Sequence, residues 1–390
     1  MQTGKQFVFD KKLTSRTMNK TAKNKTSYHK SVGAKIILPI LLLGLAVAIL
    51  LYGCSKKANT SSETGNSNAP LIVTTIFPEY DWVMNILGDN PANARVVLLA
   101  DNGVDLHSFQ PSAEDILTIS DCDVFVYVGG ESDQWVDKAL KNARNENMIV
   151  VNLMDVLGDR AALEECVEGM QDDEDEHHHS DEEGENHNPD ADSTEEESPE
   201  DDEGPEYDEH VWLSLRNAGI LCDSIENAIQ TVDPDHAQIY IDNLNQYKEK
   251  LTELDNRYSE TVNTAPYDTL LFGDRFPFRY MTDDYNLNYY AAFKGCSAES
   301  EATFDTILFL SGKVDELSLP AVCIIDGSDG RIADTVIKSS SSNNVSVVRF
   351  DSMQSVTADE IKNGVSYLSV MEDNLTALQT ALGLQSDYSK

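Results

Sequence analysis

Two histidines, His107 and His210, lie in sequence contexts that suit metal chemistry. His107 lies in segment 103–111, which follows a predicted strand and precedes a helix, and ligands gather at that edge of α/β sheets. His210 lies in segment 208–213, where an acidic run ends and a helix begins. Taken alone, each histidine is most simply interpreted as a structural or surface residue. A neutral imidazole is nevertheless the commonest metal ligand, so the pair directs attention to the elements around it.

Four further histidines lie within residues 171–209, which contain 21 carboxylates and no lysine or arginine. They are His177, His178, His179 and His187. Such a tract cannot bury a core, so we expect it to be disordered. One interpretation is a charged run that keeps the protein soluble. The other is an auxiliary, low-affinity metal collector beside His210, or a sensor of metal supply, and its imidazoles favour zinc over manganese.

The charge of the 390-residue chain is uneven. It carries 68 acidic against 29 basic residues, a net charge of -39, which argues against nucleic acid as a partner and is compatible with cations. Residues 1–57 reverse the pattern, with eleven basic residues and one acidic residue. The sequence therefore has a basic head, an acidic body and the very acidic insert.

The basic head has the layout of a targeting segment. An uncharged run, 36–53, follows lysines and ends at Leu51-Tyr52-Gly53-Cys54, which resembles a bacterial lipobox. We expect a signal peptide over 1–53, lipid attachment at Cys54 and a flexible polar tether over 54–69. The alternative is an uncleaved transmembrane anchor, since eighteen apolar residues can just span a bilayer. Either way, the body would lie outside the cytoplasm, anchored to the bacterial cell membrane.

The body alternates short apolar runs with helical segments, which predicts parallel sheets with crossover helices. The predicted fold is α/β, with two lobes over 70–232 and 264–390, each a mainly parallel sheet with flanking helices. A long rigid helix over 233–263 would join them, at roughly 40 Å for its helical pattern. A second long helix is expected over 358–382. The expected strands are 71–77, 94–100, 123–129, 148–153, 269–272, 287–293, 321–326 and 345–350.

Motifs for common enzyme chemistry are missing from the sequence. It contains no phosphate-binding G-x-x-x-x-G-K-[ST], no G-x-G-x-x-G after a strand, no G-x-S-x-G and no H-E-x-x-H. A metallohydrolase would also need a general base beside the metal motifs, and none is convincing. We therefore expect a protein that is not an enzyme.

Several segments together resemble the metal-binding substrate receptors of zinc and manganese ABC importers. They are 74–78, 105–111, 208–213, the long helix, 298–301 and 365–377, in that order. The resemblance implies two α/β lobes joined by a long helix, with one metal ion in the cleft. It also implies a monomeric receptor that captures Zn²⁺, or alternatively Mn²⁺, and delivers it to an importer permease and its ATPase. A metal-stabilised adhesin lipoprotein is a further alternative.

The resemblance implies four metal ligands, of which His107 and His210 match the first two. The third position falls on Gly273, which has no side chain, so the adjacent Asp274 is the natural substitute. Asp274 has the alternative of pairing with an arginine or capping a helix. The fourth ligand matches Asp329, with Asp326 as the fallback. Two neutral imidazoles and two carboxylates would neutralise a divalent ion, and this donor set suits zinc and also manganese.

The cysteines after Cys54 number five, so at least one lacks an internal partner. Two pairings are conceivable in an oxidising compartment, Cys296 with Cys323 and Cys166 with Cys222. The alternative is that these residues are buried thiols.

Overall fold

A computed structural model describes residues 69–171, 206–297, 301–342 and 344–384, all of which belong to one compact unit. The predicted signal segment 1–53, the lipidation site Cys54 and the insert histidines lie outside the described residues. None of the helices in the described ranges combines the length and hydropathy that crossing a bilayer requires.

The first lobe is built on a four-stranded parallel sheet with strand order β2-β1-β3-β4. Its strands are β1 (Leu71–Thr74), β2 (Arg95–Leu98), β3 (Val124–Tyr127) and β4 (Ile149–Asn152). Its crossover helices are α2 (Phe77–Leu87), α3 (Ala113–Asp121), α4 (Val136–Leu140) and α5 (Leu153–Leu157). The central strands β1 and β3 are apolar and almost entirely buried, as expected for a parallel sheet covered on both faces.

The second lobe repeats the arrangement, with strand order β6-β5-β7-β8 and all neighbours parallel. Its strands are β5 (Thr269–Phe276), β6 (Asn288–Lys294), β7 (Ala321–Ile325) and β8 (Ser346–Phe350). Its helices are α8 (Arg279–Tyr285), α9 (Phe304–Leu317), α10 (Arg331–Ser339), α11 (Ala358–Lys362) and α12 (Tyr367–Ala381). In both sheets the chain order reverses beside a central strand, and ligands bind beyond the carboxyl ends of strands at such switch points.

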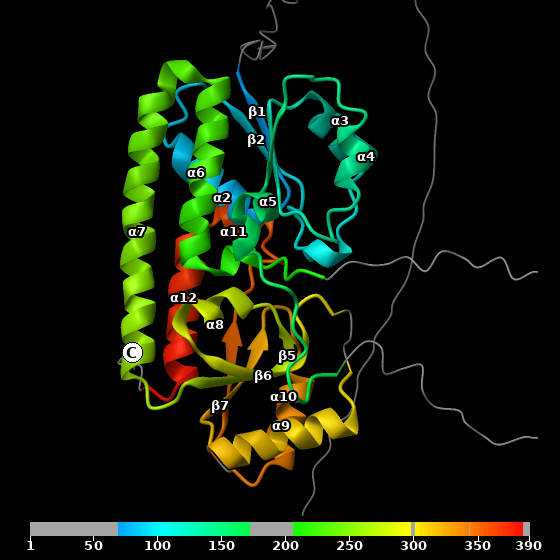
Figure 1. Cartoon of the computed structure of the whole chain (residues 1–390), viewed down its shortest axis with the longest axis vertical. Helices are drawn as coiled ribbons and strands as arrows, with labels where there is room; N and C mark the ends of the chain where they lie inside the picture. The colour runs from blue at the N-terminus through cyan, green and yellow to red at the C-terminus, as the bar shows by residue number, and fades with distance from the viewer. Residues whose placement is uncertain (1–68, 172–205, 298–300, 343, 385–390) are drawn as a thin grey trace, which may run out of the picture. The chain divides into compact units, whose positions relative to one another are not determined.

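Two long helices connect the lobes. The helix α6 (Leu215–Val232) packs on the first lobe, and α7 (Ala237–Thr264) follows it after a short turn. With 28 residues, α7 is about 42 Å long. It contacts α2 and α6 on the first lobe and α8 and α12 on the second, alongside both sheets in Figure 1. The two parallel sheets and the joining helix confirm the predicted fold class.

The structure corrects two element boundaries. The long closing helix expected over 358–382 is two helices, α11 and α12, because Gly364 takes a positive φ of 97° between them. The helix expected to begin at Phe276 begins at Arg279. Phe276 instead ends β5, where its buried ring stacks on Tyr289 with centroids 3.8 Å apart. It also precedes a proline, which disfavours the helical conformation.

The described cysteines do not form either conceivable disulfide. Cys222, Cys296 and Cys323 all carry thiols, which excludes both the Cys296–Cys323 and the Cys166–Cys222 pairing. Cys222 and Cys323 are buried among apolar side chains. They are therefore buried thiols, which was the alternative to disulfides.

Candidate metal site

His107 lies on a short 3-10 turn, Leu106–Ser108, in the loop after β2. The Asp105 carboxylate caps this turn by accepting from the His107 backbone N–H at 3.0 Å, and Arg275 of the second lobe bonds the same carboxylate at 2.8 Å. Nδ1 of the His107 ring lies 2.8 Å from the Ser132 hydroxyl, which leaves Nε2 to face the interior of the site. Burial, and then the nearby His210, lower the pKa of His107 to about 4. Its imidazole is therefore neutral at physiological pH, as metal binding requires.

His210 is completely buried at the junction of the two lobes. Its Nδ1 donates to Asp208 Oδ1 at 2.9 Å, and its backbone N–H donates to the same oxygen at 2.8 Å. This pair of bonds fixes the ring and directs Nε2 away from Asp208. A carboxylate in this position is the usual second partner of a metal-ligating histidine. Burial alone would lower the pKa of His210, but the nearby carboxylates of Asp208, Glu209 and Asp105 together outweigh it and raise the pKa above its ordinary value.

The segment that carries His210 is fastened to the second lobe by its neighbours. Trp212 Nε1 donates to the carbonyl of Ser352 at 2.9 Å, and Tyr367 donates its hydroxyl to the carbonyl of Trp212 at 2.7 Å. Tyr280 donates to the carbonyl of Asp208 at 2.7 Å. All of these groups are buried, so the hydrogen bonds are shielded from competing water. The position of His210 is therefore set by both lobes.

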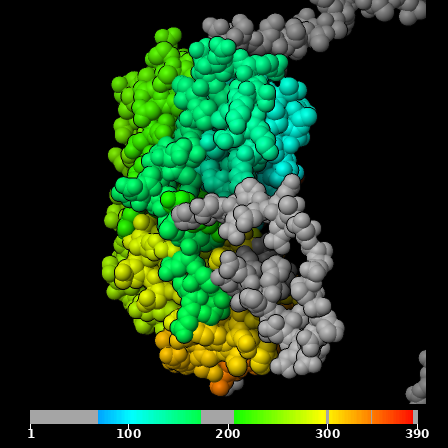
Figure 2. All heavy atoms as spheres, turned by 45° about the vertical axis from the view of Figure 1, so that its right-hand side comes forward, coloured from blue at the N-terminus to red at the C-terminus, as the bar shows by residue number. Residues whose placement is uncertain are grey.

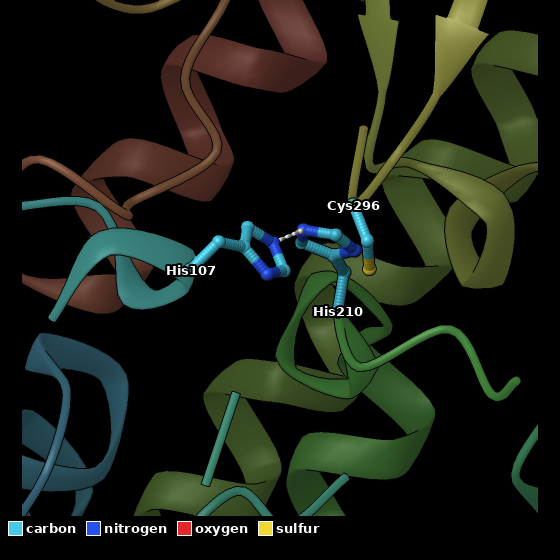
Figure 3. Close-up of side chains that lie close together, drawn as sticks. All are labelled: His107, His210 and Cys296. Carbon is cyan, nitrogen blue, oxygen red and sulfur yellow. Dashed lines mark hydrogen bonds between the residues drawn. The ribbon is translucent and has the colours of Figure 1, made fainter. Parts of the chain in front are cut away.

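The two imidazoles face each other across this junction, with Nε2 of His107 lying 3.2 Å from Nε2 of His210 (Figure 3). Because His210 Nδ1 donates to Asp208, its Nε2 accepts a hydrogen bond from His107 when both rings are neutral. Two nitrogens on one tetrahedral zinc ion are about 3.3 Å apart, given Zn–N bonds of about 2.0–2.1 Å. The observed separation is thus close to the spacing of two imidazole ligands on one tetrahedral zinc ion.

Cys296 is the third residue of this cluster. One ligand atom from each of His107, His210 and Cys296 lies within 4.8 Å of the other two. Cys296 follows the carboxyl end of β6, and the residue before it, Gly295, lies against the His210 ring. A Cβ at Gly295 would come within 3.1 Å of Cε1 of that ring, so a small residue is needed there.

The predicted carboxylate ligands line a cavity of about 620 Å³ together with His107 and Cys296, but their oxygens have other partners. Asp274 accepts from the backbone N–H of Arg275 at 3.0 Å and of Ile325 at 3.4 Å. Asp329 pairs with Arg331, and its side chain is 60% exposed. The structure thus places Asp274 and Asp329 around the same cavity without grouping them with the two imidazoles.

Asp326, the fallback carboxylate, also faces this cavity. It accepts from the Ser352 backbone N–H and hydroxyl at 2.6 and 2.7 Å, and from the Ser355 hydroxyl at 2.6 Å. These bonds tie the loop after β7 to the loop after β8. They engage both carboxylate oxygens, which gives Asp326 a structural use in the fold.

Glu209 places a buried carboxyl group beside His107. Its Oε1 accepts from the Ser132 backbone N–H at 2.8 Å. Its Oε2 lies 3.6 Å from Nδ1 of His107 and has no hydrogen-bond partner in the part of the chain that the structure describes. Burial raises the pKa of Glu209. If Nε2 of His107 bound a metal ion, the ring proton would sit on Nδ1, where the Ser132 hydroxyl and Glu209 are the acceptors within reach.

Sequence reasoning missed Asp208, Glu209 and Cys296 as parts of the site. Asp208 and Glu209 directly precede His210, and a carboxylate within two residues of a candidate ligand was an available signal. Cys296 lies just past the end of β6, at the same sheet edge that singled out His107.

The fold and the site together define a class: a two-lobed α/β receptor with a pair of facing histidines, one of them fully buried, between its lobes. The family model "Zinc-uptake complex component A periplasmic" (ZnuA) matches residues 72–381. The chain therefore belongs to the ZnuA family, whose members are solute-binding receptors and not enzymes.

The relatives agree with this assignment. The zinc-binding lipoprotein AdcA of Streptococcus pneumoniae R6 is 29% identical over 339 residues, covering 87% of this chain and 60% of AdcA. The high-affinity zinc uptake system protein ZnuA of Bacillus subtilis 168 is 25% identical over 341 residues, covering 87% of this chain and 96% of that protein. The chain thus spans about 60% of the length of the pneumococcal relative.

Solved structures show the same fold. The Zn(II)-bound ZnuA-like domain of Streptococcus pneumoniae AdcA matches with a TM-score of 0.59 and 26% identity, covering 80% of this chain and 98% of that domain. The metal-dependent lipoprotein YcdH of Bacillus subtilis matches with a TM-score of 0.61 and 23% identity, over 80% of this chain and 98% of that one.

Proposed function

We propose that this protein is an extracytoplasmic receptor that binds Zn²⁺ between its lobes through His107 and His210 and delivers it to an ABC importer permease. The observation that carries the proposal is the 3.2 Å separation of the two Nε2 atoms, which suits two ligands of one tetrahedral zinc ion. The name "zinc-binding lipoprotein" of its pneumococcal relative and the Zn(II)-bound structure of that relative's ZnuA-like domain support zinc as the cargo.

Capture proceeds by replacement of a proton. In the metal-free site, one proton links the two Nε2 atoms, and Asp208 and Ser132 hold the outer nitrogens of the rings. Zn²⁺ takes the place of that proton, and the negative charges of Asp208 and Glu209 on the outer sides compensate part of the ion's charge. Because both histidines keep their second partners, the ligands are oriented before the ion arrives.

The remaining ligands that the resemblance implied, Asp274 and Asp329, stay predictions. Both line the cavity that His107 also lines, which keeps them candidates for completing the ligand set. Each would first give up the hydrogen bonds described above.

The wider role of the receptor rests on family membership and on the head of the chain. We propose that Cys54 carries a lipid that anchors the monomer outside the cytoplasm, where it docks on the permease of an importer driven by an ATPase. The lipoprotein name of the pneumococcal relative supports the anchor. Palmitate labelling that disappears in Cys54→Ala would agree with this, and unchanged labelling would contradict it.

A binding experiment tests the core of the proposal. Zinc and manganese affinities are measured by competition with a chromophoric chelator for the full chain, His107→Ala, His210→Ala and the control His236→Ala. His236 is the remaining histidine in the described part of the chain, and it bonds Asp233 instead of facing the cavity. We expect tight zinc binding that both site variants lose and the control keeps. A preference for manganese would make this a manganese receptor. Metal binding without metal uptake in cells would favour an adhesin.

A further inference from the structure

We propose that the Cys296 thiolate is the third protein ligand of the bound Zn²⁺, which gives a site of two imidazoles and one thiolate. The inference rests on the proposed function, since it concerns the same ion. It departs from the set of two histidines and two carboxylates expected from the sequence, because it replaces a carboxylate oxygen with sulfur.

The placement of Cys296 is the first support. Its ligand atom belongs to the close cluster with His107 and His210, whose atoms lie within 4.8 Å of one another. Figure 3 shows its side chain beside the His210 ring, at the end of the second lobe's strands. Sulfur and nitrogen on one tetrahedral zinc ion are about 3.6 Å apart, given bonds of about 2.3 and 2.0–2.1 Å. The 4.8 Å limit of the cluster is longer than this spacing, so the sulfur has to move closer to the nitrogens when the ion binds.

The backbone around Cys296 is held in place by the first lobe. The Cys296 N–H donates to Glu164 Oε1 at 2.9 Å. Glu164 belongs to segment 161–171, which leaves the first lobe and continues over the second, where Gln171 N–H donates to the carbonyl of Ala292 at 3.0 Å. Figure 2 shows the green end of this segment against the yellow and orange surface of the second lobe. The thiol is thus positioned by both lobes, as His210 is.

The carboxylates are the competing candidates, and the structure gives each of them another use. Asp274 and Asp326 accept backbone N–H groups within the second lobe, and Asp329 pairs with Arg331 at the surface. Gly273 cannot be replaced by a residue with a side chain unless α10 moves, because a Cβ there would lie 2.6 Å from the Ala333 Cα. Cys296 therefore supplies a side-chain ligand from this lobe where Gly273 supplies none.

Burial and the nearby Glu164, Asp208 and Glu209 carboxylates raise the pKa of the Cys296 thiol, so the bound Zn²⁺ must supply the charge that favours the thiolate. Two neutral imidazoles and one thiolate leave a Zn²⁺ complex with one positive charge, while the thiol proton passes to solvent. Glu209 lies beside His107 with a buried oxygen that has no hydrogen-bond partner among the described residues, and Asp208 bonds His210. Their carboxylates offset the remaining charge from outside the ligand shell.

A thiolate ligand also affects which metal is bound. Soft sulfur ligands favour zinc, whereas manganese prefers carboxylate, carbonyl and water oxygens. A site with Cys296 therefore discriminates against manganese more strongly than a site with Asp274 and Asp329 would. This provides a structural source for zinc selectivity in a family fold that also occurs in a Mn-bound periplasmic metal-binding protein.

X-ray absorption at the zinc edge tests the proposal on the unmodified full chain loaded with one equivalent of Zn²⁺. We expect one sulfur neighbour at about 2.3 Å beside nitrogen and oxygen neighbours. Wild-type spectra with only nitrogen and oxygen neighbours would overturn the inference while leaving the proposed function intact. Failure of the chain to bind zinc would overturn the proposed function itself.

Two cysteine variants assign the sulfur. Cys296→Ser should lose the sulfur neighbour and weaken zinc binding at least about tenfold. Removing even a residue that only hydrogen-bonds a metal ligand weakens metal binding by about this factor. The exposed Cys166, replaced in Cys166→Ser, is the matched control and should leave both readouts unchanged. A sulfur signal that persists in Cys296→Ser and disappears in Cys166→Ser would contradict the assignment. If Cys296→Ser fails to fold, the wild-type spectrum still decides the question.

Discussion

Replacing Asp208 with asparagine removes the charge that holds His210, and the structure predicts the size of the effect. Asp208 accepts both the ring and the backbone N–H of His210 within 2.9 Å, and both side chains are buried. Removing such an outer partner typically costs 10- to 100-fold in metal affinity, or about 1.4–2.7 kcal/mol. Asparagine retains the shape and one acceptor oxygen, so the loss reports mainly the missing charge. We therefore expect Asp208→Asn to bind zinc about 10- to 100-fold more weakly.

The chain offers a matched control for this experiment. His236 bonds Asp233 at 2.7 Å in the same way, but on the turn before α7. Asp233→Asn should therefore leave the zinc affinity unchanged. The assay is competition with a chromophoric chelator at constant pH and salt, with circular dichroism to verify folding. Equal affinities for folded Asp208→Asn and Asp233→Asn would refute the argument that Asp208 prepares His210 for the metal.

Three further predictions concern pH, stability and the insert. Zinc affinity should fall as pH drops below the raised pKa of His210, because protons then compete for Nε2; chelator titrations from pH 5 to 8 that show no such fall would count against this. Burial raises the pKa of Asp133 to about 7, so the folded state binds this proton more tightly than the unfolded state and loses stability as pH rises toward 7. The free energy of unfolding of Asp133→Asn should therefore exceed that of the wild type by roughly 3 kcal/mol more at pH 8 than at pH 5. Urea unfolding measures both values, and the same difference at the two pH values would contradict the prediction. Deleting residues 171–206 should lower the number of zinc ions bound but preserve the tight site, and equilibrium dialysis that shows loss of tight binding would refute this separation.

Much of the fold could be predicted from the sequence because local patterns determine it. Short apolar runs separated by helices indicated two parallel sheets, and the apolar spacing in 233–263 indicated the long helix. Boundaries failed where tertiary contacts or a single residue decided them. Stacking on Tyr289 keeps Phe276 in β5, and Gly364 interrupts the closing helix.

The site was predictable only in part. His107 and His210 stood out because each lies in a recognisable segment at the edge of a predicted element. Their contact across 103 positions, and the proximity of Cys296, depend on how the carboxyl ends of the two sheets meet. The local sequence around Cys296 does not predict that this residue lies close to the two histidines. Asp274 and Asp329 were chosen from the family resemblance, and they stay predictions. The hydrogen bonds that these carboxylates make depend on the fold and could not be predicted from the sequence.

The most direct test of the central claim is a crystal structure of the zinc-loaded protein, with anomalous diffraction measured at the zinc and manganese edges. We predict an anomalous peak at the zinc edge within bonding distance of Nε2 of both His107 and His210. A peak away from these two nitrogens, or a site that scatters anomalously at the manganese edge instead, would contradict this account.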